Sequence, residues 1–176
     1  IRDREPDPVQ QLLEEMTLEQ KVGQLFLVRP DSLDLSQTQD QINDAKADGV
    51  TKLTDAMRQT LAEYPVGGVV IFGKNLESPQ QITQFLDDLQ QASDTPLFTA
   101  IDEEGGLVAR LANNAAFDLP QYESAAAVGT SGNPEDARAM GRTIGGYLKE
   151  YGFNLDFAPV ADVNTNPDNP VIGTRA

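Results

Sequence analysis

The stretch "GGVVIFGKNLESPQQITQFLDDLQQASDTPLFTAID", residues 67–102, decides the fold. Residues 67–72 are a run of β-branched and aromatic side chains opened by glycines, which predicts a strand buried on both faces. Ser78 and Pro79 predict a helix start, because proline is favoured at the first helical position. Residues 97–101 predict a second strand. The helix between them has an apolar face at spacings i, i+3, i+4 and i+7, formed by Ile82, Phe85, Leu86 and Leu89.

The same alternation continues on both sides of this stretch. Residues 25–28 are short and apolar and predict a buried strand. Asn133 and Pro134 predict the start of another helix, which ends at Gly152. Residues 153–160 predict a fourth strand. The apolar stripe expected on this last helix comprises Ala137, Met140, Ile144, Tyr147, Leu148 and Tyr151.

The N-terminal part predicts helices around a flexible start. The opening stretch "IRDREPDP", residues 1–8, is charged and carries two prolines, which predicts a flexible arm over residues 1–7. Residues 8–16 predict a helix, and Thr17 with Gln20 forms the pattern of a capping box for a second one. Residues 31–63 are polar and helix-prone and predict one or two further helices.

Strands alternating with helices predict an α/β fold with a parallel sheet and right-handed crossovers. Two architectures fit this order: a doubly wound open sheet, or part of a (β/α)₈ barrel. No strand is followed by G-x-G-x-x-G, and the phosphate-binding motif G-x-x-x-x-G-K-[ST] is absent. Nucleotide binding by a glycine-rich loop therefore has no support.

Composition excludes several classes of function. The chain has 176 residues and a net charge of −15, without the basic patch that nucleic-acid binding requires. No apolar run is long enough to span a bilayer. Cysteine and histidine are absent, which excludes disulfides, Cys/His zinc sites and Ser-His-Asp chemistry from these residues.

Polar residues gather directly after the predicted strands. Asn75 follows the second strand, Asp102 the third, and Asp162 and Asn164 the fourth. In α/β barrels, active sites are built at this carboxyl-terminal edge of the strands.

The segment "AIDEEGG", residues 100–106, allows two interpretations. One is an exposed acidic turn in which the glycines permit unusual backbone angles. The other is a sugar site, since Asp102 ends a buried strand and Arg110 lies eight residues further on. A carboxylate accepts hydrogen bonds from vicinal hydroxyls, and a guanidinium donates to others in a fixed fork. Two interpretations also remain for the final loop, residues 157–176. It is either a plain polar loop or a functional loop that contains Arg175.

Four ordered stretches resemble one known family. "MTLEQKVGQLF", "GGVVIFGKN", "IDEEGGLVARL" and "LDFAPVADVNTNPDNPVIGTR" are similar to successive motifs of the N-terminal domain of glycoside hydrolase family 3, closest to the bacterial β-N-acetylhexosaminidases. The resemblance covers the chain from about Pro8 onward. It implies a (β/α)₈ barrel that removes terminal β-linked N-acetylhexosamine from glycans such as peptidoglycan fragments, with retention and without a metal or other cofactor.

The resemblance also implies roles for individual residues. Asp102, Arg110 and Arg175 match the family's substrate-binding aspartate and arginines. Leu107 and Glu103 stand where the family often has arginine and glutamine. Asp162 and Asn164 match scaffold positions.

The family's catalytic groups have no counterpart here. The resembled nucleophile is an aspartate beyond residue 176, and the acid/base comes from a histidine-containing loop, whereas this chain has no histidine. We therefore expect residues 8–176 to form the first half of a barrel, which is inactive alone and is truncated on its C-terminal side.

A half barrel would leave strand edges open, so we expect either a second polypeptide carrying the other half or self-association. Two alternatives stay open for function: a non-catalytic sugar-binding or assembly module, and half of a family 3 β-glucosidase or β-xylosidase. The acidic, cysteine-free composition and the start at Ile1 favour an exported or cell-surface location.

Overall fold

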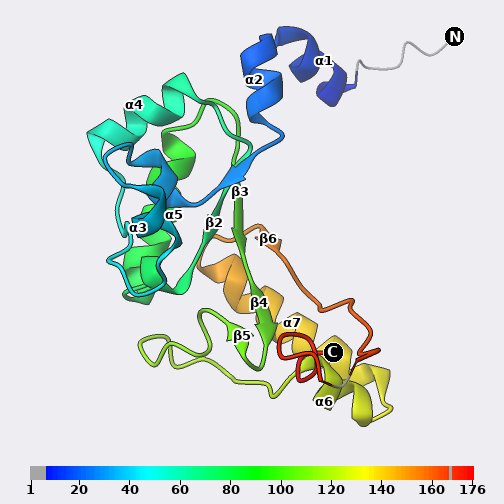
Figure 1. Cartoon of the computed structure of the whole chain (residues 1–176). Coiled ribbons are helices and arrows are strands. Elements are labelled where there is room, and N and C mark those ends of the chain that lie inside the picture. Colours follow the sequence, from blue (N-terminus) through cyan, green and yellow to red (C-terminus); the bar gives the residue numbers. More distant parts are fainter. Residues whose placement is uncertain (1–6, 167) are drawn as a thin grey trace, which may run out of the picture.

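The computed structural model describes residues 7–166 and 168–176 (Figure 1). The predicted flexible arm, residues 1–7, lies outside this part of the chain except for Asp7. The Asp7 side chain accepts a hydrogen bond from the Val9 amide and caps the first helix.

A four-stranded parallel sheet forms the centre of the fold. Its spatial order is β1-β2-β3-β6, and every neighbouring pair is parallel. A doubly wound sheet reverses its strand order at a switch point, whereas this order runs in one direction along the sequence. The chain therefore has the strand arrangement of the first half of a (β/α)₈ barrel, as predicted. The strands are β1 (Leu27–Val28), β2 (Gly68–Ile71), β3 (Phe98–Ile101) and β6 (Leu155–Asp156).

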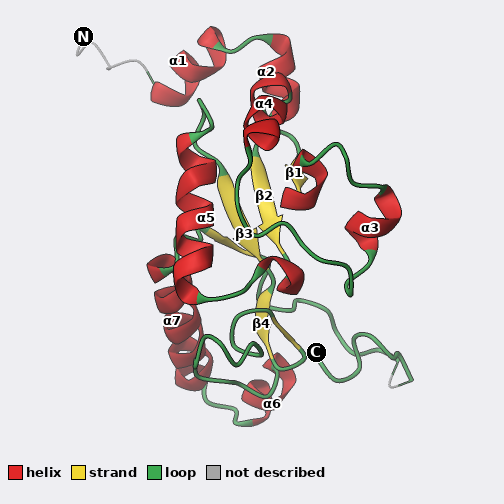
Figure 2. Cartoon of the chain, turned by 90° about the vertical axis from the view of Figure 1, so that its left-hand side faces the viewer, coloured by secondary structure: helices red, strands yellow, loops and turns green. Residues whose placement is uncertain are grey.

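Helices cover one face of this sheet, which is turned to the viewer in Figure 2. Val69, Ile71 and Ile101 point from the strands into a core shared with these helices. The covering helices are α4 (Asp55–Glu63), α5 (Pro79–Gln91) and α7 (Pro134–Glu150). All four residues of the predicted apolar face of α5 are buried, and Ser78 caps that helix as predicted. On α7 the buried stripe is narrower than predicted, because Ala137 is exposed and Tyr151 is half-buried.

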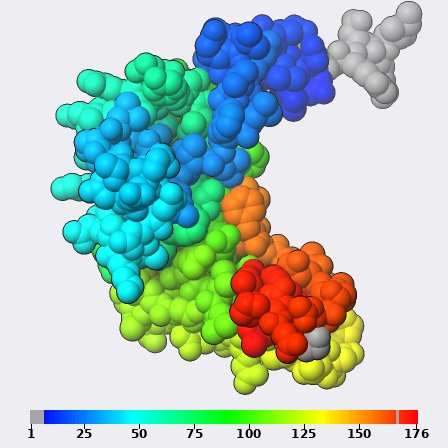
Figure 3. All heavy atoms as spheres, in the orientation of Figure 1, coloured from blue at the N-terminus to red at the C-terminus, as the bar shows by residue number. Residues whose placement is uncertain are grey.

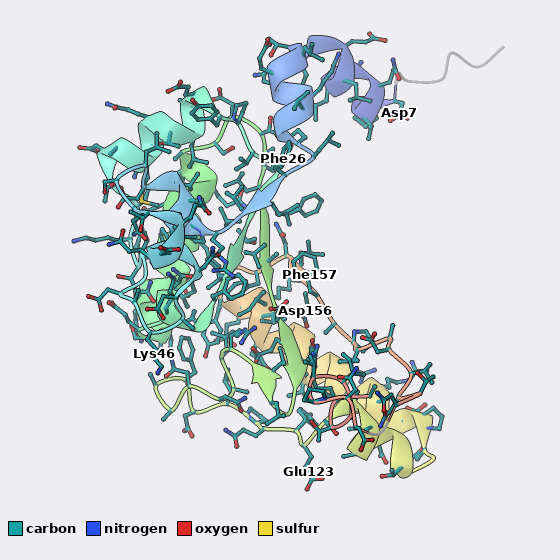
Figure 4. All side chains as sticks on the ribbon, viewed as in Figure 1. Asp7, Phe26, Lys46, Glu123, Asp156 and Phe157 are labelled. Carbon is teal, nitrogen blue, oxygen red and sulfur yellow. The ribbon has the colours of Figure 1, made fainter. Side chains whose placement is uncertain are left out.

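The opposite face of the sheet is open. Leu27, Phe98 and Gly68 are in register, so their side-chain positions share this face, and Phe98 is 52% exposed. Figure 3 shows the molecule hollowed on this side, and Figure 4 places Phe157 there. The predicted burial of residues 25–28 is wrong: Leu25 and Phe26 precede β1 and are exposed, and the two residues of β1, at the edge of the sheet, are only half-buried.

Two short helices precede the sheet. The Thr17 hydroxyl accepts from the Gln20 amide and the Gln20 side chain accepts from the Thr17 amide, which confirms the predicted capping box. Neither helix has a buried residue. They are α1 (Pro8–Glu15) and α2 (Leu18–Gly23).

The excursion between β1 and β2 contains helices, as predicted. Asp31 is fully buried beneath it and accepts hydrogen bonds from the Val50 amide and from Asn75 Nδ2. Lys74 Nζ lies 3.3 Å from the same carboxylate and donates to two carbonyls of the excursion, those of Gln41 and Ile42. The short elements of the excursion are η1 (Pro30–Leu33) and α3 (Gln39–Asn43), and η2 (Gly73–Asn75), which carries Lys74 and Asn75, directly follows β2.

The connection from β3 to α7 holds elements that the sequence did not predict. β4 (Glu103–Gly105) and β5 (Val108–Ala109) form a two-stranded antiparallel hairpin immediately after β3. A short helix, α6 (Ala125–Thr130), follows before α7. The predicted fourth strand over residues 153–160 is reduced to the two residues of β6.

No helix in residues 7–166 and 168–176 is both long and apolar enough to cross a bilayer.

Candidate functional site

The candidate site lies at the carboxyl-terminal edge of the sheet, where β3 passes into the β4–β5 hairpin. Asp102 is the residue between these strands, and Arg110 directly follows β5. The hairpin folds back on itself, so Arg110 Nη2 comes to 3.1 Å from Asp102 Oδ2. The Asp102 side chain is 25% exposed and the Arg110 side chain is 30% exposed. The predicted pair is thus formed and stays open to solvent.

Arg110 and a second arginine both lie against the ring of Phe72. Arg110 Cζ lies 5.4 Å from the centroid of the Phe72 ring, and Arg29 Cζ lies 4.3 Å from it. Both distances fall within the range of cation–π attraction. Arg29 also donates from Nη1 to the Ile42 carbonyl at 2.7 Å. Sequence reasoning missed Phe72 and Arg29, although their places at the ends of the first two strands were a usable signal.

Arg175 is held by Glu104. Arg175 Nε donates to Glu104 Oε2 at 2.9 Å, and Arg175 Nη2 donates to Oε1 at 2.5 Å. The hydrogen bonding that Arg175 donates to Glu104 raises the pKa of the Arg175 guanidinium, and the negative charges of Glu104, Asp162 and Asp102 act in the same direction. The structure therefore brings Arg175 to the acidic turn after β3, while its direct partner is Glu104.

Glu103 has a structural place in the interior. Its side chain is fully buried and accepts hydrogen bonds from the amides of Leu111 and Ala112, both at 2.9 Å. The Tyr147 hydroxyl donates to the same carboxylate at 2.9 Å. Burial, followed by the charge of Glu103, raises the pKa of Tyr147. Glu103 thus fastens the hairpin to α7, a role that the sequence did not indicate.

Asp156 lies beside this cluster at the end of β6. Its Oδ1 accepts from the Glu103 amide at 2.9 Å. Burial raises the pKa of Asp156, and the charges of Glu103, Asp102 and Glu104 raise it further, against the lowering effect of that hydrogen bond. The strand ends thus concentrate four carboxylates in one region.

The two glycines of the turn adopt backbone angles that other residues rarely adopt. Gly105 has φ of +90° and Gly106 has φ of +62°. A Cβ on Gly106 would overlap the carbonyl oxygen of Glu123, and one on Gly105 would press on the Met140 methyl group. The glycines therefore permit a tight reversal against the protein's own backbone.

The other polar residues after strand ends do not join this site. Asn75 is fully buried and donates to Asp31 and to the Val50 carbonyl, so it supports the excursion after β1. Asp162 and Asn164 are exposed in the final loop, where Asn164 donates to the Gly173 carbonyl. Leu107, at the tip of the hairpin, is 74% exposed.

Comparison with known proteins assigns the family. Residues 17–176 match the family described as "Glycosyl hydrolase family 3 N terminal domain". The chain belongs to this family. Over 132 residues it is 36% identical to the beta-hexosaminidase A of Pseudoalteromonas piscicida, a match that covers 72% of this chain and 22% of that protein.

Solved structures of the same family superpose on most of the chain. A family 3 beta-N-acetylglucosaminidase from Paenibacillus sp. str. FPU-7 matches with a TM-score of 0.71 and 34% identity, over 89% of this chain and 26% of that one. A beta-N-acetylhexosaminidase from Beutenbergia cavernae matches with a TM-score of 0.68 and 27% identity, over 90% of this chain and 44% of that one. The family 3 chain thus spans less than half the length of these relatives.

Proposed function

We propose that this chain is the substrate-binding half of a retaining glycoside hydrolase that removes terminal β-linked N-acetylhexosamine from glycans. The observation that carries the proposal is the solvent-accessible Asp102–Arg110 pair at the mouth of β3, in a chain of family 3. Similar proteins from Pseudoalteromonas piscicida and Thiobacillus denitrificans are named beta-hexosaminidases, and the similar solved structures described above are a beta-N-acetylglucosaminidase and a beta-N-acetylhexosaminidase.

The chemistry of the pair suits a sugar. The Asp102 carboxylate accepts hydrogen bonds from hydroxyl groups, and Arg110 donates to hydroxyl or carbonyl oxygens in a fixed geometry. Arg110 Nε is buried and has no hydrogen-bond acceptor among the described residues. A buried donor without a partner costs free energy. Arg175 is the third substrate contact of this proposal.

The contacts of the acidic turn favour a nucleophile and an acid/base that are not among its three carboxylates. Retaining hydrolysis needs a nucleophilic carboxylate and an acid/base group about 5 Å apart across the bond. Each of the three acids in the turn is already engaged: Asp102 with Arg110, Glu103 with three donors, and Glu104 with Arg175. We propose that the nucleophile and the acid/base lie in the remaining part of the barrel.

We further propose that this remaining part covers the open face of the sheet. β6 is a terminal strand of the sheet, and beside it lies a mostly apolar pocket of about 480 Å³. Small residues of α7 line it, namely Ala137, Gly141 and Gly145, which allow close approach of another backbone. An exposed apolar sheet face with free edges favours association with further strands.

A non-catalytic sugar-binding module is the second candidate, favoured by the engagement of all three acids of the turn.

The experiment that tests the proposed function measures both sugar binding and turnover. We expect the chain to bind N-acetylglucosamine in preference to glucose and to release no product from an aryl β-N-acetylglucosaminide. Product should appear once the chain is assembled with the rest of a family 3 barrel. Turnover by the chain alone would contradict the assignment of the missing groups, and equal binding of glucose would contradict the substrate class. An assembled barrel without turnover would favour the second candidate.

A further inference from the structure

Glu104 and Arg175 meet from distant parts of the chain. Glu104 lies in β4, 71 residues before Arg175, and its side chain is 9% exposed. The contact is bidentate, since the Nε–H and one Nη2–H of the guanidinium each reach a different carboxylate oxygen. Such a paired contact fixes the plane of the guanidinium as well as its distance from the carboxylate.

Glu104 is itself rigidly placed. The Glu103 side chain before it is fully buried and accepts three hydrogen bonds, while the Glu103 amide donates to Asp156. Gly105 after it has φ of +90°, which fixes the turn of the hairpin. Because the residues on both sides of Glu104 are fixed, its carboxylate has a defined position. Arg175, which lies in the final loop, can be oriented against it.

The loop that carries Arg175 has little other support. In residues 157–166 and 168–176 there is no helix or strand. Its side-chain hydrogen bonds are largely internal, such as those from the Val171 and Ile172 amides to Asn169. Near the end of the loop, the Ala126 amide reaches the Arg175 carbonyl at a long 3.4 Å. The ion pair to Glu104 is therefore the main contact that sets where the Arg175 guanidinium lies.

The contact leaves donors free for a ligand. A guanidinium has five N–H donors, and Glu104 takes two of them. The remaining three comprise both hydrogens on Nη1 and the second hydrogen on Nη2. Arg175 can thus keep its contact with Glu104 and still donate to an oxygen of a bound sugar.

We propose that Glu104 is a positioning residue, whose carboxylate orients the Arg175 guanidinium so that its free donors reach the sugar bound at Asp102. This inference rests on the proposed function, because it assigns Glu104 a task within the same sugar site. It differs from a purely structural role, which would predict a change in stability without a matching change in affinity for sugar.

The first measurement needs no ligand. In the unaltered chain, the Arg175 Nε–H should exchange with solvent about tenfold more slowly than that of Arg138, whose ion pair with Glu135 is exposed. Glu104→Gln should abolish this protection. Equal exchange rates for Arg175 and Arg138 would overturn the proposal, whatever the chain binds.

The second measurement is the affinity for N-acetylglucosamine. Glu104→Gln and Arg175→Lys should each weaken binding by about tenfold, because both destroy the paired contact while keeping side-chain volume similar. The double variant should be no weaker than either single one, since the two residues act as a unit. Glu123→Gln, the same change at an exposed glutamate, is the matched control. The unfolding midpoint of each variant separates loss of affinity from loss of fold.

The outcomes separate the two proposals. If the unaltered chain does not bind N-acetylglucosamine, the proposed function fails. If it binds, and Glu104→Gln keeps full affinity while Arg175→Lys loses it, Arg175 acts without positioning by Glu104 and the inference is overturned. Additive effects of the two substitutions would also overturn it.

Discussion

At the scale of single residues, the acidic turn after β3 distributes its three carboxylates among different partners. Asp102 faces solvent beside Arg110, Glu103 is buried against Tyr147, and Glu104 holds Arg175. Asp156 adds a fourth carboxylate next to them, bonded to the Glu103 amide. Neighbouring negative charges disfavour the ionisation of a carboxyl group. The protonation of one of these four residues should therefore affect the free energy of unfolding.

Asp156 is that residue, because its pKa is raised mainly by burial. The folded chain then holds this proton at pH values where the unfolded chain, with a carboxyl pKa of about 3.9, has lost it. The contribution of Asp156 to stability therefore falls as pH rises through its folded-state pKa. Asp156→Asn removes this dependence and keeps an oxygen for the Glu103 amide.

We expect Asp156→Asn to gain stability relative to the unaltered chain as pH rises from about 4 toward neutrality, and then to level off. Urea unfolding of both proteins across this range measures the difference. The exposed Asp87→Asn reports the effect of removing one negative charge from a chain of net charge −15. A difference between Asp156→Asn and the unaltered chain that stays constant with pH would contradict the assignment.

Sequence reasoning reached only part of this cluster. The Asp102–Arg110 pair could be predicted, because its members are eight residues apart and flank a short reversal. The partners of Glu103 and Glu104 could not, because Tyr147 and Arg175 lie 44 and 71 residues away. Local spacing carries no information on which distant elements meet at a strand end.

At the scale of elements, the β4–β5 hairpin makes the site by returning Arg110 to Asp102. Its turn depends on Gly106, whose φ of +62° and close approach to the Glu123 backbone exclude a side chain. Gly106→Ala should therefore destabilise the chain by at least about 1–3 kcal/mol and weaken sugar binding, because the hairpin must move to admit the methyl group.

Gly129→Ala is the matched control for this prediction. A Cβ there meets nothing within 4 Å, and the residue lies in α6, where alanine is favoured over glycine. We expect it to leave stability unchanged or raise it by up to about 1 kcal/mol. Thermal unfolding of both variants measures the contrast; an equal effect of the two substitutions would show that the Gly106 turn is not required.

The long helices could be predicted closely from sequence, and the short elements could not. Proline at the first position and an apolar stripe predict both α5 and α7. The strands β1 and β6 are two residues long and lie at the two edges of the sheet, where each pairs on one side only. The hairpin could not be predicted, because β4 is acidic and ends in glycine rather than being apolar, and β5 is only two residues long.

At the scale of the whole molecule, the main feature is that helices cover only one face of the sheet. Phe98 and Phe157 are each about half exposed, with exposed fractions of 52% and 47%, on the side that the helices leave open; Figure 4 shows Phe157 on this side. The net charge of −15 opposes self-association, whereas this apolar face favours it.

We expect the apolar face to prevail when salt screens the charge. The isolated chain should sediment as more than a monomer at high ionic strength, and Phe98→Lys together with Phe157→Lys should shift it toward monomer. The matched control replaces exposed apolar residues elsewhere, Leu107 and Val163, with lysine. A sharp monomer of the unaltered chain at every salt concentration would contradict this expectation.

The central claim is that Asp102 binds an amino sugar at the mouth of β3. Its most direct test is calorimetric titration of N-acetylglucosamine into the unaltered chain, Asp102→Ala and the exposed control Asp48→Ala. We expect Asp102→Ala to weaken binding at least about tenfold, through loss of charge-assisted hydrogen bonds, and Asp48→Ala to bind as the unaltered chain does. Unchanged affinity in Asp102→Ala would contradict the central claim.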